Sequence, residues 1–165
     1  MTRASAISTD RGHSRAGKGR VIPFPVRGPN GADQANKIRS QKLTILIVED
    51  HGSLCDMLSL YFMRYGYHVR TAGDGENALT ILENEEVHLV LLDLMLPRID
   101  GFAVLRQIRE RQESKHPYFI VVSAGASTKD RSRVLEMGAN EYMPKPFHLM
   151  RLLERIQNVE KYLLS

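Results

Sequence analysis

The sequence predicts an α/β fold, a doubly wound five-stranded parallel sheet with five helices. From Leu43 onward, five short apolar runs alternate strictly with five amphipathic segments, as expected for strand–helix–strand crossovers. Two of the runs consist almost wholly of Leu, Ile and Val, which is typical of parallel strands covered by helices on both faces. No internal repeat suggests another architecture.

The five predicted strands differ in how well they should be covered. Residues 43–48 and 87–92 are the near-continuous apolar runs, so we expect them at the centre of the sheet. Residues 118–122 form a similar run. Residues 68–71 and 140–143 are shorter and more polar, and they suit the edges of the sheet or less covered positions.

A helical pattern follows each strand. Apolar residues recur at three- and four-residue spacing in each of the five segments, and glycines stand after the first and fourth, where a glycine commonly ends a helix. The apolar positions and the two glycines are Leu54, Met57, Leu58, Tyr61, Phe62 and Gly66; Ala78, Leu79 and Leu82; Phe102, Leu105 and Ile108; Val134, Leu135, Met137 and Gly138; Leu149, Leu152, Leu153, Ile156 and Val159.

Charge divides the chain into two parts. The net charge is +4, but residues 1–42 hold nine Lys/Arg against two acids, so residues 43–165 carry a net charge of −3. The first part is also rich in Gly, Pro and Ser, and we expect a disordered basic tail before a folded domain at 43–165. Residues 21–26, Val-Ile-Pro-Phe-Pro-Val, are either a polyproline-like docking motif or an incidental apolar stretch in a linker.

Composition limits the class of protein and its location. The chain has 165 residues, 42% of them hydrophobic and 25% charged, which fits one soluble globular domain. No apolar stretch is long enough to cross a membrane, and the N-terminus has no signal-peptide core, so we expect a cytoplasmic protein without integral membrane association. The basic start also has the composition of an organelle transit peptide. Cys55 is the single cysteine, which excludes an intramolecular disulfide.

Charged and polar residues stand where the predicted strands end. Glu49 and Asp50 follow the first strand, Asp93 follows the third, Ser123 ends the fourth, and Lys145 follows the fifth. Because the carboxyl ends of parallel strands meet at one edge of the sheet, these side chains should converge. Three gathered carboxylates repel one another unless a cation neutralises them, and oxygen ligands favour Mg²⁺, with Mn²⁺ as an alternative.

Four separated motifs resemble the receiver domains of two-component response regulators. They occur in order, one at each of four strand ends, and the resemblance covers residues 43 to about 163. It implies a flavodoxin-like receiver fold with strand order 2-1-3-4-5. The motifs are Ile-Leu-Ile-Val-Glu-Asp at 45–50, Leu-Leu-Asp-Leu-Met-Leu-Pro-Arg-Ile-Asp-Gly at 91–101, Val-Ser-Ala at 122–124 and Gly-Ala-Asn-Glu-Tyr-Met-Pro-Lys-Pro-Phe at 138–147.

The resemblance implies a metal-dependent phosphoacceptor. Asp93 is then the carboxylate nucleophile that takes a phosphoryl group from the phosphohistidine of a sensor histidine kinase or histidine phosphotransfer protein. Glu49, Asp50 and Asp93 itself then form the Mg²⁺ site. The backbone carbonyl of Met95 is the further protein ligand of the metal.

The resemblance also implies a switch. Lys145 pairs with the phosphoryl oxygens, and the Lys145–Pro146 bond is cis in the family. The Ser123 hydroxyl moves to hydrogen-bond the phosphoryl group, and Tyr142 turns inward to fill the vacated space. If Tyr142 does not switch, it is a half-buried strand tyrosine.

The resemblance implies that a partner recognises the phosphorylated state on the face made by the fourth helix, fifth strand and fifth helix. Arg133, Glu141 and Arg155 lie where transcription-factor branches of the family place charges that pair across a homodimer, although Asn140 replaces a common acid there. Solvent-exposed charges without a partner are the other interpretation. The chain ends at Ser165 directly after the last predicted helix, so we expect a stand-alone receiver acting through an unidentified output protein.

Two other functions are compatible with parts of the sequence. An aspartate-nucleophile phosphatase or phosphotransferase of the haloacid-dehalogenase type places a second acid two residues after the nucleophile, where this chain has Met95. The second function is nucleic-acid binding through the basic tail. The tail lacks the interleaved aromatic residues on which bases stack, so we do not expect direct DNA binding. We therefore expect a regulator and no enzyme, with slow self-dephosphorylation because neither Met95 nor Gly125 can position a water molecule.

Overall fold

The computed structural model describes residues 42–112, 116–124 and 128–165. Strands and helices alternate strictly along these residues, and each predicted strand agrees with the observed one within two residues at either end. The predicted tail, residues 1–42, lies outside the described residues except for Lys42. The elements are β1 (Thr44–Val48), α1 (Gly52–Arg64), β2 (His68–Ala72), α2 (Gly75–Asn84), β3 (Leu89–Leu92), α3 (Gly101–Arg109), β4 (Tyr118–Ser123), α4 (Thr128–Glu136), β5 (Glu141–Pro144) and α5 (Leu149–Leu163).

The five strands form one parallel sheet in the order β2-β1-β3-β4-β5, which confirms the predicted fold class. The polar strands β2 and β5 lie at the edges, and the apolar strands β1, β3 and β4 lie between them, as their composition predicts. Val48 stands beside Leu92 in the register, so the residues that follow β1 and β3 emerge next to each other.

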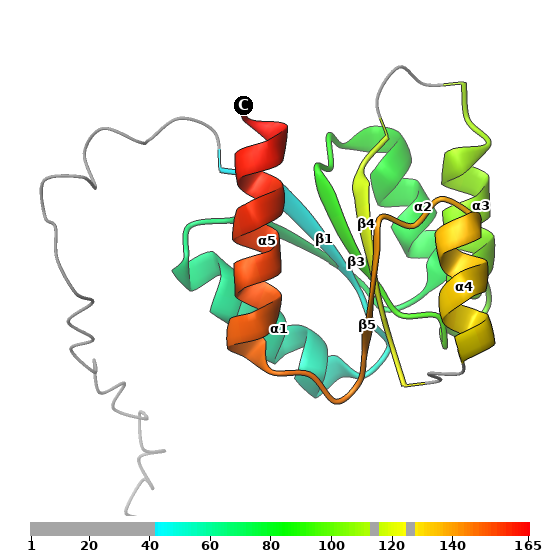
Figure 1. Ribbon diagram of the computed structural model, residues 1–165, viewed down its shortest axis with the longest axis horizontal. Coiled ribbons are helices and arrows are strands. Elements are labelled where there is room, and N and C mark those ends of the chain that lie inside the picture. The colour runs from blue at the N-terminus through cyan, green and yellow to red at the C-terminus, as the bar shows by residue number, and fades with distance from the viewer. Residues whose placement is uncertain (1–41, 113–115, 125–127) are drawn as a thin grey trace, which may run out of the picture.

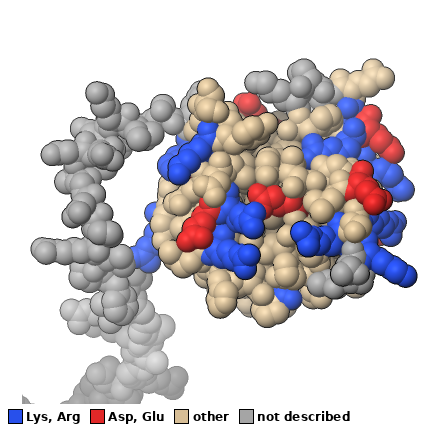
Figure 2. Space-filling model, in the orientation of Figure 1, with Lys and Arg blue, Asp and Glu red and all other residues tan. Residues whose placement is uncertain are grey.

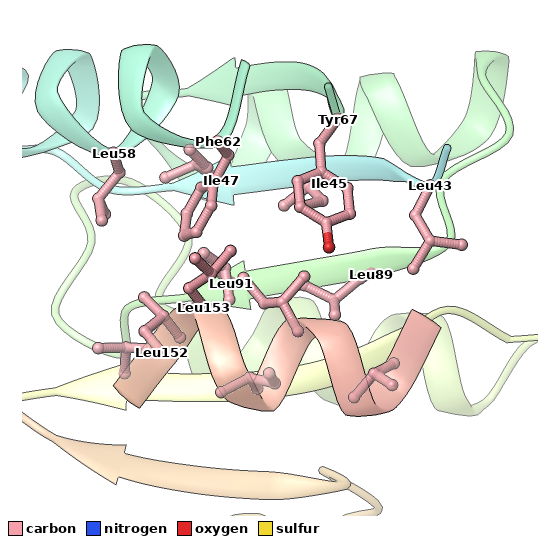
Figure 3. Close-up of a cluster of buried hydrophobic side chains, with 14 of the residues drawn as sticks. Leu43, Ile45, Ile47, Leu58, Phe62, Tyr67, Leu89, Leu91, Leu152 and Leu153 are labelled. Carbon is pink, nitrogen blue, oxygen red and sulfur yellow. The ribbon is translucent and has the colours of Figure 1, made fainter. Parts of the chain in front are cut away.

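Helices cover both faces of the sheet (Figure 1). One buried cluster joins the sheet to α1 and α5, and a second joins it to α2, α3 and α4. Alternate residues of each central strand belong to the two clusters in turn, since successive side chains point to opposite faces of the sheet. In Figure 3, Ile45 and Ile47 of β1 and Leu91 of β3 lie among Phe62 of α1 and α5 side chains. Full burial of one such side chain contributes roughly 1.5–3 kcal/mol.

The helix ends follow local chemistry. Gly66 and Gly138, the predicted helix stops, have positive φ angles of 88° and 99° just after α1 and α4, a conformation that suits glycine. His51, Asp74 and Asp100 cap α1, α2 and α3 by accepting a backbone N–H with their side chains. His51 and Asp74 lie within three residues of the ends of β1 and β2, whereas the connection from β3 to Asp100 is longer.

No helix in the described part of the chain combines the length and apolar character that crossing a membrane requires.

Candidate functional site

Asp93 lies at the carboxyl end of β3 with only 6% of its surface exposed. One carboxylate oxygen, Oδ1, accepts the backbone N–H of Met95 at 3.0 Å. The other, Oδ2, lies 2.5 Å from Lys145 Nζ. A buried carboxylate requires such partners, because an unpaired buried charge is unfavourable. The carboxylate is therefore held in one orientation by its own loop and by the residue that follows β5.

The structure brings together the three carboxylates that the sequence predicts to converge. Ligand atoms of Glu49, Asp50 and Asp93 all lie within 4.8 Å of one another. Glu49 and Asp93 are buried, whereas Asp50 is exposed to solvent. The backbone N–H of His51 donates to Glu49 Oε1 at 3.2 Å, a contact that the sequence did not indicate. The cluster is thus closed on the sheet side and open at Asp50.

Lys145 supplies the positive charge inside this cluster. Its Nζ lies 2.5 Å from Glu49 Oε2 and 2.5 Å from Asp93 Oδ2, and its side chain is 17% exposed. Burial alone lowers the pKa of an ammonium group, but the hydrogen bonds and charges of Asp93 and Glu49 outweigh it and raise the pKa of Lys145. Its backbone N–H donates to the carbonyl of Ser123 at 3.0 Å, and the Lys145–Pro146 bond is cis.

The donor set fits a hard divalent cation. All three clustered acids offer oxygen, with no sulfur or imidazole among their ligand atoms, and Mg²⁺ commonly takes one or two carboxylates and keeps several waters. Exposed Asp50 leaves a side from which water can reach such an ion. Met95, whose carbonyl is the further predicted ligand, is placed next to the cluster by its N–H bond to Asp93.

Ser123 and Tyr142 lie on neighbouring strands and face the same side of the sheet. Phe119 and Val121 belong to the cluster beneath α2, α3 and α4, and Ser123 continues that alternation, while Tyr142 packs against the same cluster. Among the described residues, neither the buried Ser123 Oγ nor the Tyr142 hydroxyl finds a hydrogen-bond partner. Burial, followed by the charges of Asp130 and Asp93, raises the pKa of Tyr142. Two unpaired hydroxyls therefore lie between the acid cluster and α4.

The charges predicted to pair across a homodimer are engaged within the chain. Arg155 Nη1 pairs with Glu141 Oε2 at 2.8 Å, and the Tyr118 hydroxyl donates to Glu141 Oε1 at 3.0 Å. The Arg133 guanidinium lies 4.3 Å from the centre of the Phe102 ring. Basic and acidic side chains are interspersed over the visible face of α5, β5 and α4 (Figure 2). The dimer itself stays a prediction.

An apolar groove of about 380 Å³ adjoins Lys145. Its walls come from the N-terminal half of α1, from the residue after β4 and from the β5–α5 connection, and Lys145 is the one charged residue among them. The groove is lined by Leu54, Met57, Ala124, Lys145, Pro146, Phe147 and Leu149. The helical pattern of α1 predicted its buried face, but the sequence did not show that part of its apolar surface would border the acid cluster.

Sequence reasoning also missed an ion pair beside the site. Arg98 Nη2 contacts Oδ2 of Asp74, a carboxylate whose side chain is only 5% exposed. Asp74 stands two residues before Glu76 at the start of α2, a position from which a helix cap could have been recognised. Its partner could not, because the two residues are 24 positions apart and meet only in the tertiary structure.

Residues 45–157 match the family model described as response regulator receiver domain. Among curated proteins, the chain is 40% identical over 119 residues to "Probable transcriptional regulator ycf27" of Porphyridium aerugineum, a match that covers 72% of this chain and 48% of that protein. It is 38% identical over 122 residues to the protein of the same name from Porphyra purpurea, covering 74% and 49%. The chain therefore spans about half the length of these relatives.

Solved receiver structures share the fold. The non-phosphorylated HemR receiver domain from Leptospira biflexa superposes with a TM-score of 0.66 at 34% identity, covering 72% of this chain and 94% of that one. A CheY-like response regulator receiver domain protein from Methanospirillum hungatei JF-1 gives a TM-score of 0.65 at 28% identity, covering 74% and 99%.

Proposed function

The chain belongs to the response regulator receiver domain family of two-component systems, and on that premise we propose that Asp93 is the phosphoacceptor of a signalling switch. The observation that carries the proposal is the strand-end cluster, in which a buried carboxylate, two further acids and one lysine meet. Asp93 attacks the phosphorus of a phosphohistidine through a carboxylate oxygen, forming an acyl phosphate as the bond to the histidine nitrogen breaks.

The residues around Asp93 have separate electrostatic roles in the proposed transfer. Glu49 and Asp50, with the Met95 carbonyl, would hold Mg²⁺, which supplies charge neutralisation for the incoming phosphoryl oxygens. Lys145, already a donor to Asp93, binds a phosphoryl oxygen as a point charge. The Met95 N–H keeps Asp93 Oδ1 occupied, which leaves Oδ2 as the oxygen that attacks once Lys145 turns to the phosphoryl group.

The phosphoacceptor is tested with a small donor. The protein is incubated with phosphoramidate and Mg²⁺, and the intact mass is measured for the wild type and for Asp93→Asn. We expect one added phosphoryl group, about 80 Da, on the wild type and none on the variant. Asp56→Asn, at an exposed acid on α1, is the matched control and should be modified like the wild type. An adduct of equal size on Asp93→Asn would show that another residue accepts the group.

The unpaired hydroxyls support a switch through Ser123 and Tyr142. Each hydroxyl lacks a partner in the described structure, so each gains a hydrogen bond if it moves to one. A phosphoryl oxygen on Asp93 would provide that partner for Ser123, and Tyr142 would turn into the space that opens. Ser123→Ala should be phosphorylated but should transmit less of the change to the α4–β5–α5 face, measured by amide chemical shifts there. Wild-type shifts in the phosphorylated variant would remove Ser123 from the switch.

The apolar groove beside Lys145 supports docking of the phosphodonor protein. The groove reaches the cluster, and Met57 on its wall is 43% exposed. Met57→Glu should slow transfer from a histidine kinase that phosphorylates the wild type, while the rate with phosphoramidate stays the same. Met63 is 47% exposed on the same helix but does not line the groove, so Met63→Glu is the matched control. Equal effects of the two substitutions would argue against docking at the groove.

Homodimerisation through α4, β5 and α5 would require the intramolecular pairs to exchange partners. Arg155 would leave Glu141, so the dimer should form only when phosphorylation supplies a driving force. Sedimentation of the phosphorylated and unphosphorylated protein tests this, and a monomer in both states would exclude it.

We also propose that the phosphorylated protein loses its phosphoryl group slowly on its own. The Met95 side chain is 71% exposed and carries no group that positions water. Gly125, the second position considered, lies outside the described residues.

A further inference from the structure

The connection between β3 and α3 is a closed loop that begins and ends at Asp93. The Gly101 N–H donates to the carbonyl of Leu94 at 3.1 Å. A Cβ atom on Gly101 would lie 2.2 Å from the carbonyl oxygen of Asp93, so the returning chain touches the acceptor's own backbone. Within this loop, Met95 donates its N–H to the Asp93 carboxylate. A shift of the Met95 or Gly101 backbone would therefore alter a direct contact of Asp93.

The outer end of the loop is attached to the start of α2. Arg98 contacts the buried carboxylate of Asp74 and also lies 3.6 Å from Glu76 Oε2. The next residue, Ile99, packs so closely on Gly75 that a Cβ atom there would lie 2.2 Å from the Ile99 carbonyl oxygen. Two consecutive residues of the loop, Arg98 and Ile99, thus contact the N-cap and the first residue of α2, and these contacts fix the position of the loop.

The backbone at Arg98 indicates that this attachment is under constraint. Arg98 has a φ angle of 65°, and it is the non-glycine residue with positive φ among those described. Arginine rarely adopts this left-handed conformation, which persists where surrounding contacts enforce it and is common at functional sites. The contacts around this position are those of Arg98 with Asp74 and Glu76 and the packing of Ile99 on Gly75. Of the two acids, only Asp74 is buried, so it offers Arg98 the more fixed partner.

Asp74 has more than one role. Its Oδ1 accepts the Asn77 N–H at 2.9 Å, which caps α2, while Oδ2 accepts Asn77 Nδ2 at 2.7 Å and the Arg98 guanidinium. The cap alone needs no arginine, because the backbone N–H already has its acceptor. The additional pair joins the β2–α2 connection to the β3–α3 loop.

We propose that Arg98 and Asp74 are positioning residues for the phosphoacceptor site, holding the loop so that the Met95 backbone stays aligned with Asp93. The inference rests on the proposed function for its consequence, namely that the pair maintains the affinity of the site for Mg²⁺. Neither residue belongs to the acid cluster. They act through the two residues, Leu96 and Pro97, that separate Met95 from Arg98.

The test uses variants that remove the pair between Arg98 and Asp74 but keep the positive φ at residue 98 and the cap of α2. Arg98→Asn deletes the charge but keeps a residue that tolerates positive φ. Asp74→Ser keeps a good helix cap but is too short to reach Arg98. Arg70→Asn is the matched control, because Arg70 is another 55% exposed arginine paired with an acid, Glu85, away from the site.

Binding of Mg²⁺ alone is measured by calorimetry. Arg98→Asn and Asp74→Ser should each raise the Kd for Mg²⁺ by about 3- to 10-fold, which lies within the range of energetic coupling through such networks. The double variant should bind Mg²⁺ no more weakly than the single variant with the higher Kd. Arg98→Lys should recover part of the affinity. The rate of phosphorylation by phosphoramidate should fall at limiting Mg²⁺ and return to the wild-type rate at saturation. Kd values equal to that of Arg70→Asn would overturn the inference.

A second measurement needs no metal. Amide hydrogen exchange of Met95 in the metal-free protein should be faster in Arg98→Asn and Asp74→Ser than in Arg70→Asn, because the N–H bond to Asp93 opens more often. Unchanged exchange contradicts the positioning role. If the wild type neither binds Mg²⁺ nor accepts a phosphoryl group, the proposed function fails, and the exchange rates alone decide the inference.

Discussion

Replacing Lys145 with methionine should destabilise the metal-free protein by about 3 kcal/mol, within the effects seen when a buried ion pair loses one partner. Methionine keeps most of the length and volume of lysine but removes the ammonium group that lies 2.5 Å from Glu49 and from Asp93. Both carboxylates are buried, so water replaces the lost charge poorly.

The magnitude follows from the distances. Two unit charges at 4.8 Å, the outer limit for the clustered oxygens, repel by about 3.5 kcal/mol at an effective dielectric constant of about 20. Lys145 is 17% exposed, so solvent already screens part of this repulsion and the expected loss is somewhat smaller.

Urea denaturation in EDTA and in excess Mg²⁺ measures the effect. The difference in unfolding free energy between the wild type and Lys145→Met should narrow in Mg²⁺, which neutralises the same carboxylates. Arg155→Met removes an exposed pair with Glu141 and should cost less than about 1 kcal/mol in both conditions. A Lys145→Met protein as stable as the wild type in EDTA would refute the reasoning, as would a loss of the same size in EDTA and in Mg²⁺.

Three further predictions concern single side chains. Gly101→Ala should lower stability by about 1–3 kcal/mol and reduce phosphorylation by a small donor, because its Cβ would displace the carbonyl of Asp93, and thermal melting with intact mass checks both effects. Ser123→Ala should leave the unphosphorylated protein as stable as the wild type or slightly more so in urea, since the buried hydroxyl has no partner among the described residues, and a loss above about 1 kcal/mol would reveal one. Burial, followed by the hydrogen bond to Glu141, raises the pKa of Tyr118 to about 12. The contribution of Tyr118 to the unfolding free energy is therefore complete below about pH 10 and is lost as the pH rises toward 12. Tyr118→Phe should lose less stability over this pH range than the wild type, and equal losses would contradict the prediction.

The acid cluster was predictable because of how parallel sheets are built. Glu49 and Asp93 each follow an apolar run, and strands whose side chains are covered on both faces must place their carboxyl ends at one edge. The charge at Lys145 follows from the same rule applied to β5. The polarity of β2 and β5 also indicated their edge positions, since an edge strand is less covered.

The supporting contacts were not predictable in this way. The link between Arg98 and Asp74 joins connections that follow different strands, and it depends on a left-handed backbone at a residue that seldom adopts one. Likewise, the sequence indicated Glu141 and Arg155 as surface charges that pair with another molecule. In the fold, β5 and α5 place these two side chains 2.8 Å apart, so they pair with each other.

The strands, the helices, their alternation and the residues at the strand ends could all be predicted from the chain, because they depend on the periodicity of apolar residues. The contacts that hold the site emerged with the packed fold: the Lys145 ammonium between Glu49 and Asp93, the unpaired hydroxyls beside it, and the attachment of the loop at Arg98. The reason is that local patterns are set by neighbours along the chain. Side-chain pairs between separate connections depend on distances that exist only once the sheet and helices have packed.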